Sequence, residues 1–236
     1  MNMLKKVAQS SLAALGARCP FALLHNMNDA LNYMWAGHWM HSHDLKVERR
    51  MKTREQIFEF AASQIGQAEV LYLEFGVFGG TSLAQWSQLL KNPASKLHGF
   101  DSFEGLPESY EGYDIGYFDK GGILPDINDP RITLFKGWFS DTIPKYKLPP
   151  HNKLFVTFDA DLYSSTKIVL DFIEPHVVPG AYFYFDEFEG KEHEMKAFSE
   201  FLTATGYKFR VLAATPGWGR VLFQCVSADR KHVVST

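Results

Sequence analysis

The sequence predicts an α/β fold built on a mostly parallel sheet that helices cover on both faces. From about residue 53 onward, short apolar strands alternate with segments of helical periodicity, a pattern typical of parallel sheets. Only the hexapeptide Ala-Ala-Thr-Pro-Gly-Trp separates the last two strands. Because a parallel connection needs a longer crossover, these two strands are expected to form an antiparallel hairpin.

Composition limits the number of domains and the kind of partner. The 236 residues, 46% of them hydrophobic, suit one α/β domain at 53–236, preceded by an N-terminal helical arm or lid at 1–52. The formal net charge of −3 argues against nucleic acid as the main partner, because phosphate binding leaves a basic footprint. No apolar run is long enough to cross a membrane, so we expect a small-molecule partner.

Cysteine usage indicates the compartment. Cys19 and Cys225 lie far apart and form no Cys-x-x-Cys motif, which argues against a disulfide framework and a zinc knuckle. We therefore expect a reducing compartment, the cytoplasm. The basic pair Lys5-Lys6 leaves a signal peptide open, although polar residues dilute the apolar stretch that follows it.

The first 50 residues are rich in Met, His and Trp and carry apolar residues at helical spacing, from Phe21 to Met34. Such a surface packs on the core, covers a ligand, or joins copies of the chain as a homodimer or higher homo-oligomer. Packing is the favoured interpretation. The group His38, His41, His43 and Asp44 lacks a second set of ligands at a recognised spacing, so we expect a surface turn there and not a metal site.

Thr53-Arg-Glu-Gln56 resembles a capping box and begins an amphipathic helix that leads into the first strand. The strands expected from the apolar runs are 69–74, 96–101, 132–136, 153–160, 180–186, 207–212 and 219–225. The helices expected between them are 80–91, 163–174 and 191–204, with a short one near 140–147.

The segment from Val70 to Ser82 passes from a buried strand through glycines into a helix, and it organises the chain. Glycine permits positive φ and close approach of a ligand, and the helix N-terminus offers unpaired N–H groups. The glycine spacing differs from the dinucleotide fingerprint, and Glu74 precedes the first glycine, where a carboxylate repels a pyrophosphate but attracts a cation. We interpret the turn as a cofactor cradle; the alternative is an ordinary strand-to-helix turn.

Acidic residues end several of the expected strands. In an open parallel sheet the ligand lies beyond the carboxyl ends of the strands. Asp101, next to the glycine turn, is placed to accept the hydroxyls of a ribose, unless it is only a loop acid. Asp159 and Asp161 follow one strand and Asp186-Glu187 the next, where their repulsion favours a divalent cation such as Mg²⁺. The alternative is a set of solvated acids.

Four segments resemble the macrocin O-methyltransferase family, which belongs to the class I S-adenosylmethionine-dependent methyltransferases. They are Glu74-Phe-Gly-Val-Phe-Gly-Gly-Thr-Ser82, Gly99-Phe-Asp-Ser-Phe-Glu-Gly-Leu-Pro-Glu108, Lys136-Gly-Trp-Phe-Ser-Asp-Thr-Ile-Pro144 and Asp159-Ala-Asp-Leu-Tyr-Ser-Ser-Thr166. The resemblance covers about residues 53 to 225. It implies a Rossmann-like, seven-stranded sheet whose last strand is antiparallel, in agreement with the expected hairpin.

The resemblance also implies an enzyme that transfers a methyl group from S-adenosyl-L-methionine to a hydroxyl of a sugar or other natural product, with Mg²⁺. The cofactor-binding positions that it implies are Glu74, Gly76, Gly79, Gly80, Thr81, Ser82, Asp101, Ser102, Phe103, Phe139, Ser140 and Asp159. Asp101 would hold the ribose, with the adenine near Phe139 and Ser140. The implied metal positions are Asp159, Asp186 and Glu187. The family usually has Asp-Asp where this chain has Asp186-Glu187, so its second acid is one methylene longer.

The chemistry is consistent with these residue types. Methyl transfer needs the acceptor oxygen in line with the methyl group, and a hydroxyl is a poor nucleophile until it is deprotonated. Mg²⁺ bound by the acids would lower the pKa of that hydroxyl. The candidate bases are Asp161, Asp159 itself and His193, for which a plain helix-start histidine is the alternative. The aromatic and glycine-rich stretch 103–131 is long for a connection and is interpreted as a substrate lid; the alternative is a surface loop with its own small aromatic core.

Two rival functions stay open. A nicotinamide-dependent oxidoreductase on a similar sheet is disfavoured by the glycine spacing and by the terminal hairpin. A non-catalytic module that keeps only the cofactor pocket is disfavoured by the acids at 159, 161 and 186.

Overall fold

The computed structural model describes residues 3–110 and 112–229, in which eight strands form one sheet with the order β1-β7-β8-β6-β5-β2-β3-β4. The strands are β1 (Val47–Arg50), β2 (Val70–Phe75), β3 (Lys96–Asp101), β4 (Ile132–Lys136), β5 (Lys153–Phe158), β6 (Tyr182–Phe185), β7 (Lys208–Ala214) and β8 (Val221–Ser227). The α-helices are α1 (Met3–Gly16), α2 (Phe21–Ser42), α3 (Arg54–Ile65), α4 (Thr81–Leu89), α5 (Phe139–Thr142), α6 (Tyr163–Ile173) and α7 (Glu194–Thr205). The expected mostly parallel α/β fold is confirmed.

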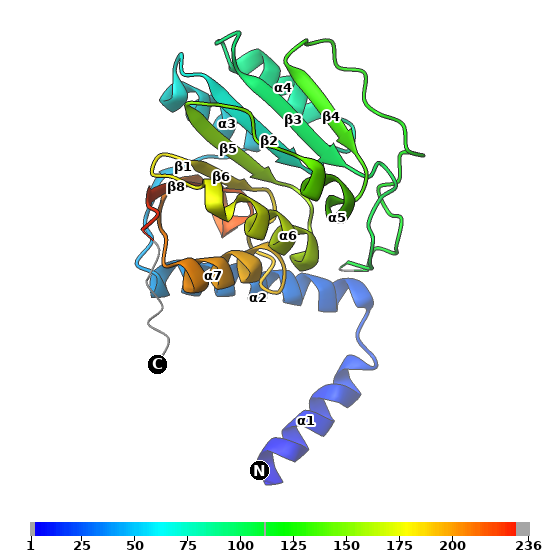
Figure 1. Cartoon of the computed structure of the whole chain (residues 1–236). Helices are drawn as coiled ribbons and strands as arrows, with labels where there is room; N and C mark the ends of the chain where they lie inside the picture. Colours follow the sequence, from blue (N-terminus) through cyan, green and yellow to red (C-terminus); the bar gives the residue numbers. More distant parts are fainter. Residues whose placement is uncertain (1–2, 111, 230–236) are drawn as a thin grey trace, which may run out of the picture.

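The sheet is covered on both faces, as Figure 1 shows. Helices α2, α6 and α7 bury one face and α3 and α4 the other. Strand β2 is buried along its whole length because alternate side chains enter the two cores. Leu71 and Leu73 belong to the α6/α7 side, and Val70 and Tyr72 to the α3/α4 side. Because both faces of the strand are buried, its residues are apolar almost without interruption, as the sequence shows.

The terminal hairpin is confirmed. Strand β8 is antiparallel to both of its neighbours, β6 and β7, and it fills the gap between them. All other neighbouring strands in the described sheet are parallel. The hairpin connection contains only the short 3-10 helix η3 (Pro216–Trp218), which leaves no room for a crossover.

Strand β1 corrects the expectation that residues 1–52 are purely helical. Val47–Arg50 pairs parallel with β7, with Val47 opposite Val211, and extends the expected seven strands to eight. Its sequence, Val-Glu-Arg-Arg, has three exposed charged residues and no apolar alternation. Such a short charged strand is typical of a sheet edge and carries little sequence signal.

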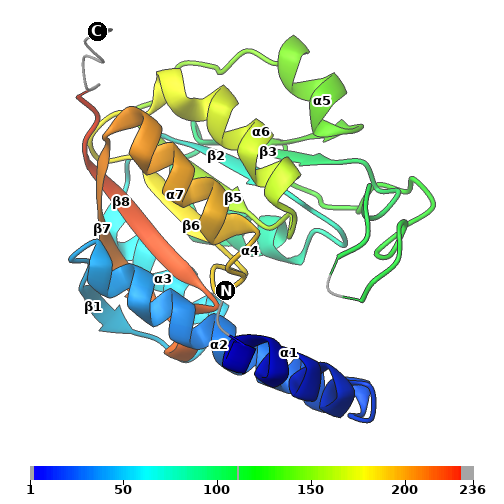
Figure 2. The same ribbon diagram turned by 90° about the horizontal axis from the view of Figure 1, so that it is seen from below.

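The arm packs on the domain through only part of its length. Trp39 in α2 contacts Phe188 and Phe198, with ring centroids 5.2 and 6.1 Å apart. Helix α1 extends away from the body of the molecule (Figure 2).

Cys19 and Cys225 are free thiols. In the part of the chain that the structure describes, no helix combines the length and apolarity needed to cross a membrane.

Candidate active site

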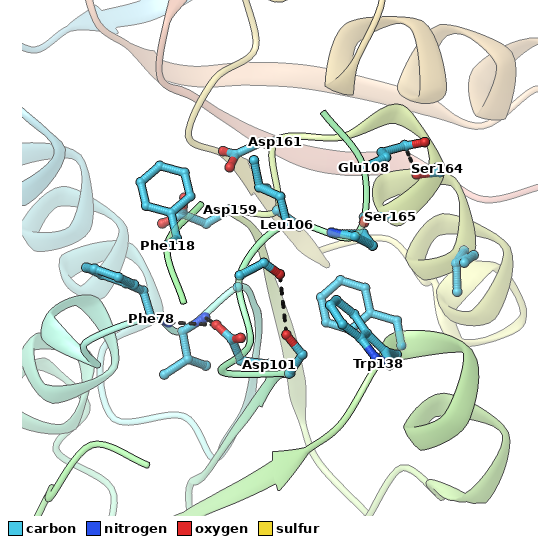
Figure 3. A pocket seen from close by; sticks show the side chains of 18 of the residues that line it. Phe78, Asp101, Leu106, Glu108, Phe118, Trp138, Asp159, Asp161, Ser164 and Ser165 are labelled. Carbon is cyan, nitrogen blue, oxygen red and sulfur yellow. Dashed lines mark hydrogen bonds between the residues drawn. The ribbon is translucent and has the colours of Figure 1, made fainter. Parts of the chain in front are cut away.

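A cavity of about 500 Å³ lies at the carboxyl ends of β2, β3 and β5, where ligands of open α/β sheets are expected (Figure 3). Residues from the glycine turn, from the stretch 101–118, from 137–140 and from the start of α6 line it. The lining includes Arg54, Gly76, Val77, Phe78, Asp101, Ser102, Leu106, Glu108, Phe118, Trp138, Phe139, Ser140, Asp159, Asp161, Ser164, Ser165, Ile168 and Glu187. The cavity therefore brings together residues from all four segments on which the family resemblance rests.

The glycine turn after β2 is required by close contact with β5. Gly76 has φ of 94°, and a Cβ there would lie 1.7 Å from the carbonyl oxygen of Asp159. Gly80 takes the left-handed conformation as the residue before α4. Gly76 lines the cavity, whereas Gly79, Gly80, Thr81 and Ser82 are not among the lining residues. Only the first part of the predicted cradle thus faces the cavity.

Glu74 lies behind the turn and not in the cavity wall. Its side chain is fully buried, and it accepts hydrogen bonds from the hydroxyls of Tyr72 and Ser82, the latter at 2.6 Å. Burial raises the pKa of this carboxyl to about 7, although both hydrogen bonds favour the ionised form. Glu74 therefore connects β2 to the first turn of α4. Its role in cofactor binding stays a prediction.

Asp101 fastens the same turn from the neighbouring strand. One carboxylate oxygen accepts the backbone N–H groups of Val77 and Phe78, at 2.8 and 2.7 Å, and the other accepts that of Phe103 at 2.7 Å. Asp101 also lines the cavity, as the predicted ribose site requires. Ser102 lines it too, whereas Phe103 is buried in the core under α4.

The predicted adenine region faces the cavity. Phe139 and Ser140 line it, together with Gly137 and Trp138. Trp138 was not singled out from the sequence, although it lies inside the third motif, directly before Phe139. Three non-glycine residues of the cavity lining, Phe78, Phe118 and Asp161, have positive φ values of 50°, 71° and 60°. Backbone strain of this kind persists where surrounding structure enforces it and is common at functional sites.

Two arginines that the sequence analysis did not single out enter the acidic cluster. The Nη1 atom of Arg54 lies 3.5 Å from Asp159 Oδ2 and 3.7 Å from Asp186 Oδ1. Arg220 pairs with Asp186 through Nε at 3.0 Å. Burial, and next the negative charge of Asp186, raises the pKa of Asp159 well above its usual range, and Arg54 opposes that shift. No local motif marks either arginine, because both reach the site from distant parts of the chain.

The third predicted metal ligand has another partner. Glu187 lines the cavity and accepts a hydrogen bond from the Tyr110 hydroxyl at 2.5 Å. Within the described ranges, no three His, Cys, Asp or Glu side chains form a group that could hold a metal ion. The assignment of Mg²⁺ to Asp159, Asp186 and Glu187 therefore stays a prediction, and the arrangement of these side chains does not fit it.

The candidate bases are not equally placed. Asp159 and Asp161 line the cavity on the same side (Figure 3). His193 is the residue before α7 and lines a separate small hollow with Trp35 of α2. Burial lowers the pKa of His193, and its ring lies edge-on to Tyr110 with centroids 4.7 Å apart. This arrangement favours the two aspartates over His193 as groups that reach a ligand in the cavity.

The predicted lid, residues 103–131, folds back on itself beside the cavity. Isolated bridges join Glu104 to Asp119 and Tyr110 to Tyr113. Phe118 lines the cavity and packs edge-on against Phe78 of the glycine turn, with centroids 5.7 Å apart. The stretch thus contacts the glycine turn and forms part of the cavity wall. Its glycines with positive φ interrupt regular structure; they are Gly105, Gly112, Gly116, Gly121 and Gly122.

The strand order, with antiparallel β8 inserted between β6 and β7, and the cavity beside the glycine turn define the class I methyltransferase fold. The family model described as macrocin O-methyltransferase (TylF) matches residues 124–212 of this chain. That range contains Asp159, Asp161, Asp186 and Glu187 but not the glycine turn. The match confirms the resemblance to this family that the sequence analysis found in the four segments.

One curated relative is similar in sequence, and two solved structures share the fold. The relative is 8-demethyl-8-(2,3-dimethoxy-alpha-L-rhamnosyl)-tetracenomycin-C 4'-O-methyltransferase from Streptomyces olivaceus, 27% identical over 139 residues, which are 49% of this chain and 52% of that protein. The chain thus spans about half the length of that relative. The O-methyltransferase NovP superposes with a TM-score of 0.60 at 19% identity, over 73% of this chain and 79% of NovP. The calicheamicin methyltransferase CalS11 superposes with a TM-score of 0.52 at 21% identity, over 95% and 93%.

Proposed function

We propose that this protein is an S-adenosylmethionine-dependent O-methyltransferase that methylates a hydroxyl of a small molecule, a sugar or another natural product. One observation carries the proposal: a single cavity joins the glycine turn and the segment 137–140 to Asp159 and Asp161. The first two are suited to a nucleoside cofactor, and the two acids lie where a hydroxyl would react.

The lining residues fit the cofactor. Gly76 exposes backbone to the cavity, Trp138 and Phe139 offer ring faces for an adenine, and Asp101 has carboxylate lone pairs for ribose hydroxyls. When bound, S-adenosylmethionine supplies a methyl group on a cationic sulfonium. Besides Asp159, the acidic residues of the lining outnumber Arg54, which disfavours the pyrophosphate of a nicotinamide dinucleotide; they are Asp101, Glu108, Asp161 and Glu187.

The reaction is a displacement in which the acceptor oxygen attacks the methyl carbon. A C–O bond forms, the C–S bond breaks, and its electron pair stays on sulfur as a neutral thioether. The proton of the hydroxyl passes to a carboxylate, for which Asp161 and Asp159 are the candidates in the cavity wall. The protein holds the two reactants in line and excludes water. No step is routed through Mg²⁺, because the predicted ligands do not fit it.

The acceptor half of the cavity suits a glycoside or a similar amphipathic alcohol. Glu108, Ser164 and Ser165 offer hydrogen-bonding groups, whereas Leu106 and Phe118 offer apolar contact. The name of the Streptomyces olivaceus relative describes a methylated rhamnosyl group, which motivates deoxysugar glycosides as the first acceptors to try. The acids at this end make anionic acceptors unfavourable.

Calorimetry and mass spectrometry test the proposal. We expect S-adenosylmethionine to bind and NADH not to bind, and a panel of glycosides to contain at least one molecule that gains one methyl group. Binding of NADH alone would favour the oxidoreductase. Binding of S-adenosylmethionine without transfer to any hydroxylated acceptor would favour the non-catalytic module.

We further propose association of copies through the arm, and a reducing, cytoplasmic location. Large apolar side chains along α1 and α2 are exposed, among them Leu12, Phe21 and Met34 at 68, 72 and 71%. Light scattering on the purified protein, compared with a variant that carries Ser at these three positions, tests the first proposal. A monomer in both cases would contradict it. The free thiols Cys19 and Cys225 support the second.

A further inference from the structure

The Arg54 guanidinium occupies the point between the two strand ends where a shared cation would bind. Arg54 is the first residue of α3, whereas Asp159 follows β5 and Asp186 follows β6. A single nitrogen, Nη1, lies 3.5 Å from Asp159 Oδ2 and 3.7 Å from Asp186 Oδ1. The side chain is 24% exposed and lines the cavity, so this positive charge faces whatever occupies it.

Asp186 has further partners on its other side. Arg220, from the β7–β8 hairpin, donates through Nε at 3.0 Å and Nη2 at 3.4 Å, and the Tyr184 hydroxyl donates to Oδ1 at 2.5 Å. The carboxylate is only 9% exposed. Its lone pairs are therefore directed at protein donors, and a metal ion would have to displace them.

Charge balance leads to the same conclusion. Two guanidinium groups, which stay protonated at any pH that a protein tolerates, already pair with the side chains of Asp159 and Asp186. A divalent ion would add two positive charges next to these two. The longer Glu187 side chain is held by Tyr110, and the third oxygen ligand is directed elsewhere.

We propose that Arg54 replaces the divalent cation in this site, so that the protein binds no Mg²⁺ there and transfers the methyl group without it. Arg54 is a positioning residue: its guanidinium lies between the side chains of Asp159 and Asp186 at the cavity wall and supplies there the positive charge that a metal would supply. The inference about transfer rests on the proposed function, whereas the inference about metal binding does not.

Mn²⁺ binding, followed by electron paramagnetic resonance, tests the site without any acceptor, because carboxylate sites that take Mg²⁺ also take Mn²⁺. For the unmodified protein we expect no bound Mn²⁺ up to about 1 mM, the weak end of biological divalent sites. Arg54→Met removes the guanidinium and should gain Mn²⁺ affinity by at least about tenfold. Arg54→Lys, which keeps a positive charge, should not gain it. Arg210→Met is the matched control, because Arg210 is an exposed arginine paired with Glu48 outside the site.

Each result is decisive. Mn²⁺ bound by the unmodified protein and lost in Asp159→Asn would overturn the proposal. Equal absence of Mn²⁺ from the unmodified protein and from a folded Arg54→Met would also overturn it, because Arg54 would then not be what excludes the ion. If Arg54→Met does not fold, the unmodified protein and Arg54→Lys still give the decisive comparison with Asp159→Asn.

Chelation separates this inference from the proposed function. With an acceptor in hand, excess chelator should leave the rate of methyl transfer within about twofold, and a loss of all transfer would overturn metal independence. If no acceptor is methylated but S-adenosylmethionine binds and Mn²⁺ does not, the proposed function fails and the assignment of Arg54 stands.

Discussion

Gly76 lies so close to the backbone of Asp159 that a side chain on it would enter the carbonyl group: a Cβ would lie 1.7 Å from the oxygen and 2.6 Å from the carbon. This contact fixes the distance between the glycine turn and the acidic end of β5. Both residues line the cavity, so the contact joins the glycine turn and the acidic end of β5 in its wall.

Gly76→Ala is expected to destabilise the protein by more than about 2 kcal/mol, because a left-handed alanine costs about 1–2 kcal/mol before any clash is counted. Chemical denaturation measures the effect. Gly79→Ala is the matched control, since a Cβ there meets nothing within 4 Å, and its stability should change by less than about 0.5 kcal/mol. Similar losses in both variants would mean that the turn is sensitive to any substitution and that the contact with Asp159 is not the cause.

Asp101→Asn is expected to weaken S-adenosylmethionine binding and to lower stability together, because the carboxylate holds three backbone N–H groups and also lines the cavity. A hydrogen bond to a charged group contributes about 1.5–3 kcal/mol, so the affinity should fall at least about tenfold. Calorimetry and thermal unfolding measure the two effects. Lower affinity at unchanged stability would assign the carboxylate to the ligand alone, and no change in either would exclude it from the site.

The elements that were predicted correctly are those whose sequence signal lies in neighbouring residues. Strands β3 and β4 have the expected bounds because apolar runs end at turn residues, and Thr53 caps α3 by accepting the Gln56 N–H at 3.4 Å. The Gln56 side chain reaches back to the N–H of Lys52, one residue before the position that a capping box predicts.

The parts that the sequence did not indicate depend on tertiary contacts. Arg54 lies 105 positions before Asp159, so nothing in the spacing links them. An acidic cluster read from the sequence alone favours a cation from solution, because the protein's own cations are not yet placed beside it. The edge strand β1 was not predicted for a similar reason. Its pairing with β7, and not its residue pattern, makes it a strand.

Glu74→Gln is expected to change how stability depends on pH. Burial raises the pKa of Glu74 from 4.5 to about 7, so its contribution to stability is fully present below pH 4.5 and is lost as pH rises through about 7. A shift of this size corresponds to about 3 kcal/mol. The difference in unfolding free energy between the parent and Glu74→Gln, measured from pH 4 to 8, should therefore move against the parent as pH rises. A difference that stays constant over this pH range would contradict the raised pKa of Glu74.

Tyr110→Phe is expected to loosen the stretch 103–131. The Tyr110 hydroxyl donates to Glu187 at 2.5 Å and so connects this stretch to the strand end beyond β6. Without that bond, limited proteolysis within 103–131 should accelerate several-fold. On the proposal that this stretch is a substrate lid, the KM for the acceptor should also rise more than kcat falls. Tyr113→Phe is the matched control: Tyr113 is 41% exposed in the same loop and packs on Tyr117 through its ring. S-adenosylmethionine affinity should stay unchanged in both variants. Cleavage at the parent rate in Tyr110→Phe, with and without ligands, would contradict a lid held by this hydrogen bond.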